Sequence, residues 1–305
     1  MFGRRVLQSQ RIGTLIRLST MSKMLPFRWY GGKYSHLEWL LPQSPASKRY
    51  VEPFGGSAAV LLNREPAQME TFNDIDSDVT TFFKILRERP EDLLEQLALT
   101  PFSREELAKA VEETEDGESI SEVEQARRFF VRAGQTRSGL AQEATPGRWA
   151  YCTSMSRRDM SGSVSRYYGR LEDLHTVAER LRRVQIENKP AIDVIKRYDS
   201  SDTLVYCDPP YPHAARTDTS AYGYEMSEAD HRKLAAVLKE CAGEVAISSY
   251  RTDLYDELFA EWWRVNAEAK QAPTASGERE ECLYVNYEPV CRDIDSRVEV
   301  SSPGM

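Results

Sequence analysis

The chain has 305 residues, which is enough for one large or two modest domains. Hydrophobic residues make up 41% and charged residues 29%, a balance that allows a sizeable core and excludes global disorder. No run approaches the roughly 18 apolar residues of a membrane-spanning helix, so no membrane association is expected. The formal net charge of −8, taken alone, argues against nucleic-acid binding, which more often uses a basic surface.

The cysteines and the N-terminal segment indicate in which cellular compartment the protein works. The 5 cysteines are widely spaced without a CxxC pair, so we expect no metal site, no disulfide framework and a reduced, cytoplasmic protein. Residues 1–24 are basic without an acidic residue. They fit either an Arg-rich transit peptide or an upstream extension, with Met21 or Met24 as the true start. We favour the extension, expect it to be disordered or not native, and leave it out of the fold.

The first elements alternate between strand and helix. The Gly55-Gly56 turn separates the first strand from a helix for which Ser57 is the predicted N-cap. An acidic run with Asp74 and Asp76 follows the second strand, and Asp76 is expected to cap the next helix. This order is the first half of a nucleotide-binding α/β unit. Predicted strands lie at 48–54 and 69–72, and predicted helices at 57–63 and about 78–88.

The next stretch changes character in charge. Residues 88–126 carry 13 acidic and 3 basic residues, with the Leu and Phe spacing of helices that have solvated acidic faces. Residues 127–183 carry 12 Arg, no Lys and 5 acidic residues. The chain average of −8 therefore hides an Arg-rich segment in an acidic body, and the net charge does not exclude nucleic-acid binding.

Strand and helix alternate again after residue 183. The run 203–207 (TLVYC) is almost entirely apolar, which is typical of a central strand buried on both faces. Further strands are expected at 184–187 and 244–248, with an antiparallel pair at 262–267 and 281–287. Helices are expected at 191–197 and from Ser227, as N-cap, to about 241.

The predicted architecture is an α/β sheet built from two separated stretches with an insert between them. The predicted parts are an extension at 1–24, a discontinuous catalytic domain at 25–87 and 184–292, an insert at 88–183, and a disordered tail at 293–305.

The sharpest motif is Asp208-Pro209-Pro210-Tyr211, at the end of the TLVYC strand. Ligands of open parallel sheets bind at the carboxyl ends of strands. The two prolines lack N–H donors, so carbonyls there can accept hydrogens from a substrate amine beside the Asp208 carboxylate. Tyr211 offers a ring on which a base can stack. The set suits a planar group that bears an NH₂, although a strand-ending turn with a capping Asp is the simpler alternative.

Two further loops carry possible binding residues. The run Glu52–Ser57 (EPFGGS) lets the backbone approach a ligand at a helix start, and Asp74 stands where an acidic residue usually binds ribose hydroxyls. The absence of GxGxxG weakens a nicotinamide-dependent enzyme as an alternative. The run Phe27–Lys33 (FRWYGGK) can bind a carboxylate or zwitterionic group, although alone it fits an ordinary turn.

Together these motifs, in this order, resemble the Dam-type (alpha-group, DPPY-containing) family of adenosylmethionine-dependent DNA adenine N6-methyltransferases. The resemblance covers about residues 27–288. It implies a Rossmann-like methyltransferase sheet with helices on both faces, interrupted by a mainly helical target-recognition insert, and S-adenosyl-L-methionine as cofactor. One departure is Ala58, which occupies the last glycine position of the family's FxGxG loop.

The resemblance also implies roles for individual residues. The catalytic clamp would be formed by Asp208, Pro209, Pro210 and Tyr211. Residues 247–250 would help to form the wall of the adenine pocket. The cofactor would be bound by Trp29, Lys33, Phe54, Gly56, Asp74 and Asp208.

The Arg-rich insert fits a surface that contacts DNA phosphates. We expect a hairpin tip at 135–139 with Arg137 and Ser138 on DNA, and some of the Arg side chains paired with the acidic helices instead. Other expected DNA contacts are Arg157, Arg158, Arg166, Tyr167 and Tyr168.

The resemblance favours adenine in duplex DNA as the substrate of a monomeric enzyme. The same clamp would serve cytosine N4 or adenine in RNA, and a non-catalytic nucleic-acid-binding relative is the alternative from another class. Any paired restriction enzyme would be a separate protein, because no nuclease motif is visible in this chain.

Overall fold

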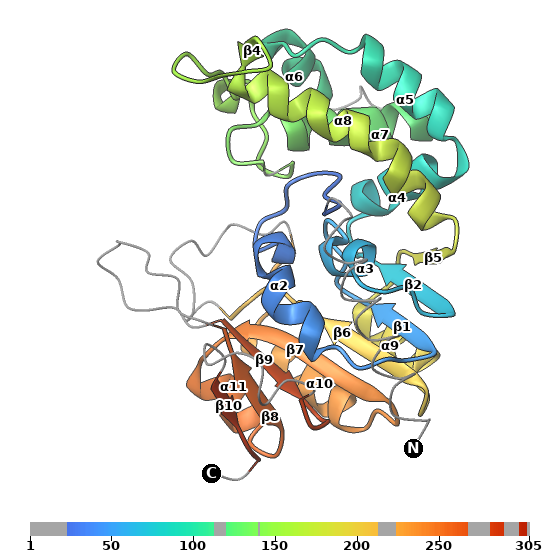
Figure 1. Ribbon diagram of the computed structural model, residues 1–305, viewed down its shortest axis with the longest axis vertical. Coiled ribbons are helices and arrows are strands. Elements are labelled where there is room, and N and C mark those ends of the chain that lie inside the picture. The colour runs from blue at the N-terminus through green and yellow to red at the C-terminus, as the bar shows by residue number, and fades with distance from the viewer. Residues whose placement is uncertain are drawn as a thin grey trace, which may run out of the picture.

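The computed structural model describes residues 23–112, 120–139, 141–212, 224–267, 281–289 and 299–303. Its centre is an 8-stranded sheet with helices on both faces, as the α/β prediction requires (Figure 1). The strands are β1 Arg49–Glu52, β2 Met69–Asn73, β5 Val184–Glu187, β6 Thr203–Cys207, β7 Glu244–Tyr250, β8 Trp263–Asn266, β9 Glu281–Val285 and β10 Glu299–Ser301.

The sheet order is β10-β8-β9-β7-β6-β1-β2-β5. The five strands from β7 to β5 are parallel, whereas β9 is antiparallel to both β7 and β8, which confirms the predicted terminal pair. All of β6 is buried, as the apolar TLVYC run predicts. The ends of β1, β2 and β6 therefore meet at one edge of the sheet, where the predicted loops follow.

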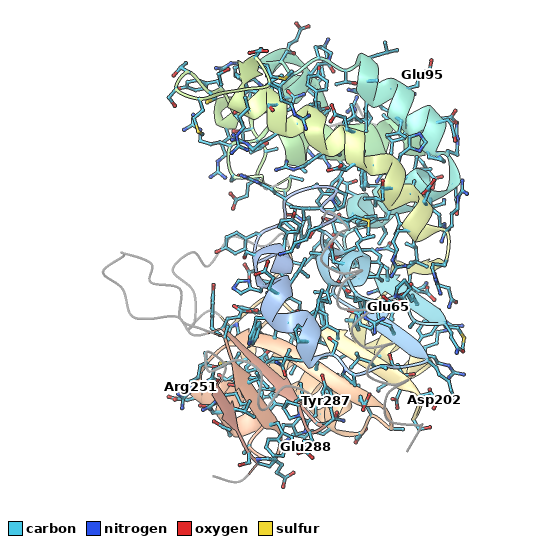
Figure 2. All side chains as sticks on the ribbon, viewed as in Figure 1. Glu65, Glu95, Asp202, Arg251, Tyr287 and Glu288 are labelled. Atoms are coloured by element: carbon cyan, nitrogen blue, oxygen red, sulfur yellow. The ribbon has the colours of Figure 1, made fainter. Side chains whose placement is uncertain are left out.

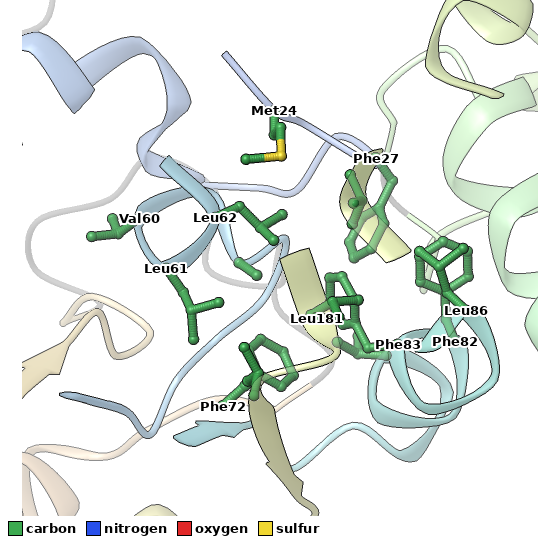
Figure 3. Close-up of a cluster of buried hydrophobic side chains, with 14 of the residues drawn as sticks. Met24, Phe27, Val60, Leu61, Leu62, Phe72, Phe82, Phe83, Leu86 and Leu181 are labelled. Atoms are coloured by element: carbon green, nitrogen blue, oxygen red, sulfur yellow. The ribbon is translucent and has the colours of Figure 1, made fainter. Parts of the chain in front are cut away.

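Successive strand residues enter two separate cores, because side chains alternate between the faces of a sheet. Tyr50 and Leu204 join a cluster with α2, α3 and α4, and part of this cluster is shown in Figure 3. Their neighbours Val51 and Val205 join a second cluster with α9, α10 and α11. The helices of the sheet domain are η1 Lys33–His36, α2 Leu37–Leu40, η2 Leu41–Gln43, α3 Ala59–Asn63, α4 Ser77–Glu88, α9 Ala191–Tyr198, α10 Glu228–Lys239 and α11 Asp253–Leu258.

The insert forms a mainly helical lobe beyond one side of the sheet (Figure 1). Its acidic side chains, such as Glu95, lie on the outside (Figure 2). Its core continues into the sheet domain, since the Phe129 ring centroid lies 4.9 Å from that of Phe27 and 5.6 Å from that of Phe82. The insert comprises α5 Pro90–Leu99, α6 Arg104–Val111, α7 Glu122–Gln135, η3 Pro146–Arg148, β3 Ser156–Arg157, β4 Met160–Ser161 and α8 Gly162–Leu181.

One predicted helix cap is wrong. Ser57 does not cap α3, which begins at Ala59 after Ala58 without a side-chain cap. The turn runs two residues longer than the Gly55-Gly56 pair suggests, because the Ala58 amide donates to the Gly55 carbonyl at 2.8 Å. Ala58 has φ +55°, in the left-handed region that glycine adopts most easily. The absent family glycine is thus replaced by an alanine in a glycine-like conformation.

The ends of the chain differ from the expected boundaries. Residues 1–22 lie outside the described part, but Met24 is buried in the core and exchanges hydrogen bonds with Asn63 at 2.7 and 2.8 Å. The predicted disorder of 293–305 is wrong for β10, which pairs with β8 and packs Val300 against the core. A strand of 3 residues is too short to show an alternating pattern in the sequence.

A buried ion pair fastens α8 of the insert to β2 of the sheet. Both Arg180 guanidinium Nη atoms contact the Glu70 carboxylate, at 2.6 and 2.8 Å, and Nη2 also donates to the Leu61 carbonyl at 2.8 Å. Both side chains are buried. Breaking a buried pair from one side leaves an uncompensated charge, so its loss is far more costly than loss of a surface pair.

We predict that Arg180→Ala lowers the free energy of unfolding by about 2 kcal/mol, because the buried Glu70 carboxylate loses two charge-assisted hydrogen bonds. Glu70 keeps only more distant cations, Arg64 at 3.6 Å and Arg183 at 3.8 Å. The matched control is Arg158→Ala, which removes the exposed pair with Glu172 at 2.9 Å and should cost less than about 1 kcal/mol. Urea denaturation measures both values. Equal losses in the two variants would contradict the assigned role of Arg180.

Candidate active site

A cavity of about 310 Å³ opens where the loops after β1, β2 and β6 converge. The lining includes six predicted residues from four separate segments: Trp29, Phe54, Gly56, Asp74, Asp208 and Pro210. A smaller hollow of about 30 Å³ shares four of these residues and adds Lys33 and Glu52. The structure therefore brings the predicted cofactor residues together with Asp208 and Pro210 of the DPPY motif.

The loop after β1 is held to the end of β2 by backbone and amide hydrogen bonds. The Gly55 amide donates to the Asn73 carbonyl at 2.8 Å, and Asn73 Nδ2 donates to the Pro53 carbonyl at 2.8 Å. Gly56 has φ +48°, and a Cβ added there would lie 2.6 Å from the Trp29 ring. Glycine is required at this position both by the backbone conformation and by the closeness of the indole.

Asp74 organises this loop as well as lining the cavity. Its carboxylate accepts from the Gly56 amide at 2.8 Å and from the Asp76 amide at 2.9 Å. Burial raises the pKa of Asp74 to about 6, although these two amides and that of Ile75 oppose the shift. Asp76 caps α4 through the Asp78 amide, which confirms its predicted role. A carboxylate has about four acceptor positions, so Asp74 keeps capacity for ligand hydroxyls.

Lys33 and Asp208 form a buried ion pair at the end of β6. The Lys33 ammonium is 2.8 Å from Asp208 Oδ1, 3.4 Å from Glu281 Oε1 and 2.8 Å from the Gly31 carbonyl oxygen. The Lys33 side chain is only 3% exposed, whereas Asp208 is 18% exposed toward the cavity. Burial raises the pKa of Asp208 to about 6, Lys33 opposes this, and the nearby Glu281 carboxylate adds to it.

Tyr211 is packed inside this cluster. Its hydroxyl donates to Glu281, the Lys33 ammonium lies 4.8 Å from its ring centroid, and the Tyr250 ring meets it edge-on at 4.9 Å. The ring is 3% exposed, so a base could stack on it only after these contacts rearrange. Tyr250 belongs to the predicted pocket wall at 247–250, which the structure places beside the clamp.

Glu281 is one of two site residues that the sequence did not reveal. It lies at the start of β9, 73 positions after Asp208, and no motif surrounds it. It reaches the site because β9 runs antiparallel beside β7. Gln142 was also missed; it comes from the insert, lines the cavity and donates to Asp76 Oδ2 at 2.8 Å.

The predicted DNA-contacting residues all lie on the insert, away from the cavity lining. Arg137 and Ser138 are exposed on the turn after α7, but Gln135 of the predicted tip is buried. Arg157 is exposed on β3, and Arg158 pairs with Glu172.

Arg166 and the two tyrosines lie on α8. Arg166 donates to Ser163 Oγ at 3.3 Å. Tyr167 is fully buried against Phe130 and Gly134, so its predicted contact with DNA is wrong. It occupies a core position of α8, while its neighbour Tyr168 is only partly buried.

The described residues hold neither a metal-ligand cluster nor a membrane-spanning helix. No group of three or more His, Cys, Asp or Glu side chains there is arranged to hold a metal ion. Among the helices described, none is long and apolar enough to cross a membrane.

The fold and the cavity define a Rossmann-like enzyme. Its DPPY motif lies beside the glycine-containing loop after β1, where enzymes of this fold bind nucleotides. Residues 29–272 match the family model of D12 class N6 adenine-specific DNA methyltransferases. The chain belongs to this family.

Named relatives cover most of the chain. A DNA N-6-adenine-methyltransferase of Escherichia phage P1 is 25% identical over 70% of this chain but only 28% of the relative's own length. The type II methyltransferase M.MjaIII of Methanocaldococcus jannaschii is 24% identical over 86% of this chain and 99% of its own length. The DNA adenine methylase of Escherichia coli (strain K12) is 26% identical over 76% of this chain and 82% of its own length.

The two hydrogen bonds to Asp74 give a test that needs no ligand. We predict that Asp74→Asn destabilises the protein by about 1–3 kcal/mol, because an amide must turn its NH₂ toward one of two N–H donors. Thermal melting without ligand measures the change.

The control for this prediction is Asp76→Asn, which should have little effect because Asn caps helices as well as Asp does. The amide of Gln142 can turn over to keep its contact with residue 76. A loss for Asp76→Asn as large as that for Asp74→Asn would contradict the argument.

Proposed function

We propose that this protein transfers a methyl group from S-adenosyl-L-methionine to the N6 amine of an adenine flipped out of duplex DNA. The observation that carries the proposal is that Asp208, first residue of the DPPY motif, lines the same cavity as Trp29, Gly56 and Asp74. The carboxylate that would accept hydrogens from the amine and the residues that would bind the cofactor therefore line the same cavity. A cytoplasmic location, where the DNA lies, is part of the same proposal.

The residues of the two adjoining hollows fit the two ends of adenosylmethionine. Asp74 retains acceptor positions for ribose hydroxyls, and Trp29 and Phe54 provide apolar contact. Lys33 lies in the smaller hollow, on the side assigned to the methionine part. When bound, adenosylmethionine would supply an electrophilic sulfonium methyl group.

The clamp residues would orient the amine. The Asp208 carboxylate and the Pro209 carbonyl would accept hydrogens from N6, while the prolines place no competing donor beside them. Positioning the amine is the main catalytic contribution expected, since the reaction needs no covalent enzyme intermediate. The base must leave the duplex to reach this pocket, and stacking on Tyr211 would offset part of the unstacking cost.

The insert would supply the DNA-binding surface. Arg137, Ser138 and Arg157 are exposed there and would face phosphates, whereas Arg158 is engaged with Glu172. Binding that depends on phosphates weakens steeply as salt rises.

The decisive experiment labels the product. Duplex DNA is incubated with the protein and methyl-labelled adenosylmethionine, then digested to nucleosides. We expect the label on N6-methyladenine. Label on N4-methylcytosine, or transfer to RNA in preference to duplex DNA, would replace the proposed substrate.

Asp208→Ala should abolish methyl transfer while leaving the affinity for DNA within about twofold, because the carboxylate acts on the amine and not on phosphates. The labelling assay and a binding titration measure the two effects. Undiminished transfer by this variant would refute the clamp role of Asp208.

The raised pKa of Asp208 also predicts a pH profile. Below a pH of about 6 the carboxyl is protonated, so it donates a hydrogen bond instead of accepting one, and the transfer rate should fall as pH falls. Glu281→Gln removes a negative charge that raises this pKa, so the acidic limb should move to lower pH. If the acidic limb of the profile stays in place in Glu281→Gln, the limb does not report the protonation of Asp208.

A further inference from the structure

Most arginines of the Arg-rich stretch neutralise carboxylates of the protein itself. Some of these pairs involve the acidic helices, as for Arg127 with Glu106 and Glu124, and others reach the sheet domain, as for Arg132 with Asp78. The arginines paired in this way are Arg127, Arg128, Arg132, Arg148, Arg158, Arg180 and Arg183.

Three arginines form a group of a different kind. Arg28 lies against Gly139, and Arg166 and Arg170 lie one turn apart on α8, whose Tyr167 packs on Gly134 in the helix that leads to Gly139. Burial, together with the charges of Arg28 and Arg166, lowers the pKa of Arg170. Within the described ranges none of the three has a carboxylate partner, and the polar contact of Arg166 is with Ser163 Oγ. Grouping unpaired like charges on a partly buried surface destabilises the free protein, so an anionic ligand is the natural complement.

This cluster lies between the insert and the loop after β1 (Pro53–Ala58). Arg28 directly precedes Trp29, which packs on Gly56 beside the cavity. On the insert side, a Cβ added to Gly139 would lie 2.8 Å from Arg28 Cβ, so Arg28 rests on the turn that carries Arg137 and Ser138. Arg166 and Arg170 approach from the first half of α8.

We propose that Arg28, Arg166 and Arg170 together bind one phosphate of the DNA strand that carries the target adenine. Guanidinium groups match phosphate oxygens in geometry and charge, and three donors from two parts of the chain can surround a single phosphate. The phosphate would be held between the insert and the cavity, which fixes the register of the flipped nucleotide. This inference rests on the proposed function.

The first test measures DNA affinity against salt for Arg28→Gln, Arg166→Gln, Arg170→Gln and the triple variant, on a duplex of mixed sequence. Each single variant should lose about tenfold in affinity, as expected for a hydrogen bond to a charged group. The triple variant should reduce the slope of log K against log salt by about 0.9, the value for one phosphate. A reduction near three times that value would mean three independent phosphates and would overturn the single site.

Arg182→Gln is the matched control, because Arg182 is exposed near the end of the same helix and has no ion pair among the described residues. It should leave both affinity and slope nearly unchanged. Losses equal to those of the cluster variants would show a general charge effect and overturn the proposal. Melting curves and adenosylmethionine titrations establish that every variant is folded.

The second test replaces single phosphates near the methylated adenine by neutral methylphosphonates. One position should weaken wild-type binding about tenfold and leave the triple variant unaffected. Equal weakening of both proteins at every position would overturn the proposal, as would losses that depend on base sequence, which would indicate base contacts. Inorganic phosphate alone is titrated into the wild type by calorimetry. If it binds while no methylphosphonate position weakens DNA binding, the cluster is a site for free anions and the proposal is overturned.

These outcomes separate the two proposals. Methyl transfer to adenine with cluster variants that behave like Arg182→Gln would leave the proposed function intact and remove only the phosphate site. Absence of methyl transfer by the wild type would refute the proposed function, while the salt slopes would still report on the cluster.

Discussion

The Lys33 ammonium is the point at which segments far apart in the sequence are joined into one site. It lies between the carboxylates of Asp208 and Glu281 and over the ring of Tyr211. A cation this deeply buried is stable only while its partners are present, and each carboxylate equally depends on the cation. The segment before the first strand, though outside the sheet, therefore fixes the geometry of the motif that follows β6.

The same pairing rule governs charge across the insert. The sequence count suggests a strongly basic stretch, but much of that charge is neutralised within the protein. Arg127 is paired with the acidic helices, Arg132 with α4, and Arg180 with β2. These pairs serve the packing of the insert, since they join its helices to one another and to the sheet. The positive surface left for DNA is consequently much smaller than segment arithmetic indicates.

The sequence predicted the site residues whose positions follow from strand order. It missed residues whose positions depend on packing between distant segments. The convergence of Gly56, Asp74 and Asp208 follows from the rule that parallel strand ends share one edge. Trp29 lies outside the sheet, and only the family resemblance pointed to it. The domain boundaries and individual roles stay predictions. Glu281 could not be found, because its position depends on β9 pairing with β7 across more than 30 residues of chain. Tyr167 was misassigned because its place in the α8 sequence does not show which side faces the core.

The segment Phe27–Trp29 shows how the two parts of the chain are mechanically joined. Phe27 is fully buried among rings that include Phe82 of α4 and Phe129 of α7. With that anchor fixed, the next two side chains diverge, Arg28 against the insert at Gly139 and Trp29 against the loop after β1 at Gly56. A close-packed anchor transmits displacement instead of absorbing it. A ligand that displaces Arg28 would therefore also shift Trp29, because the same short stretch of backbone holds the Trp29 indole against Gly56.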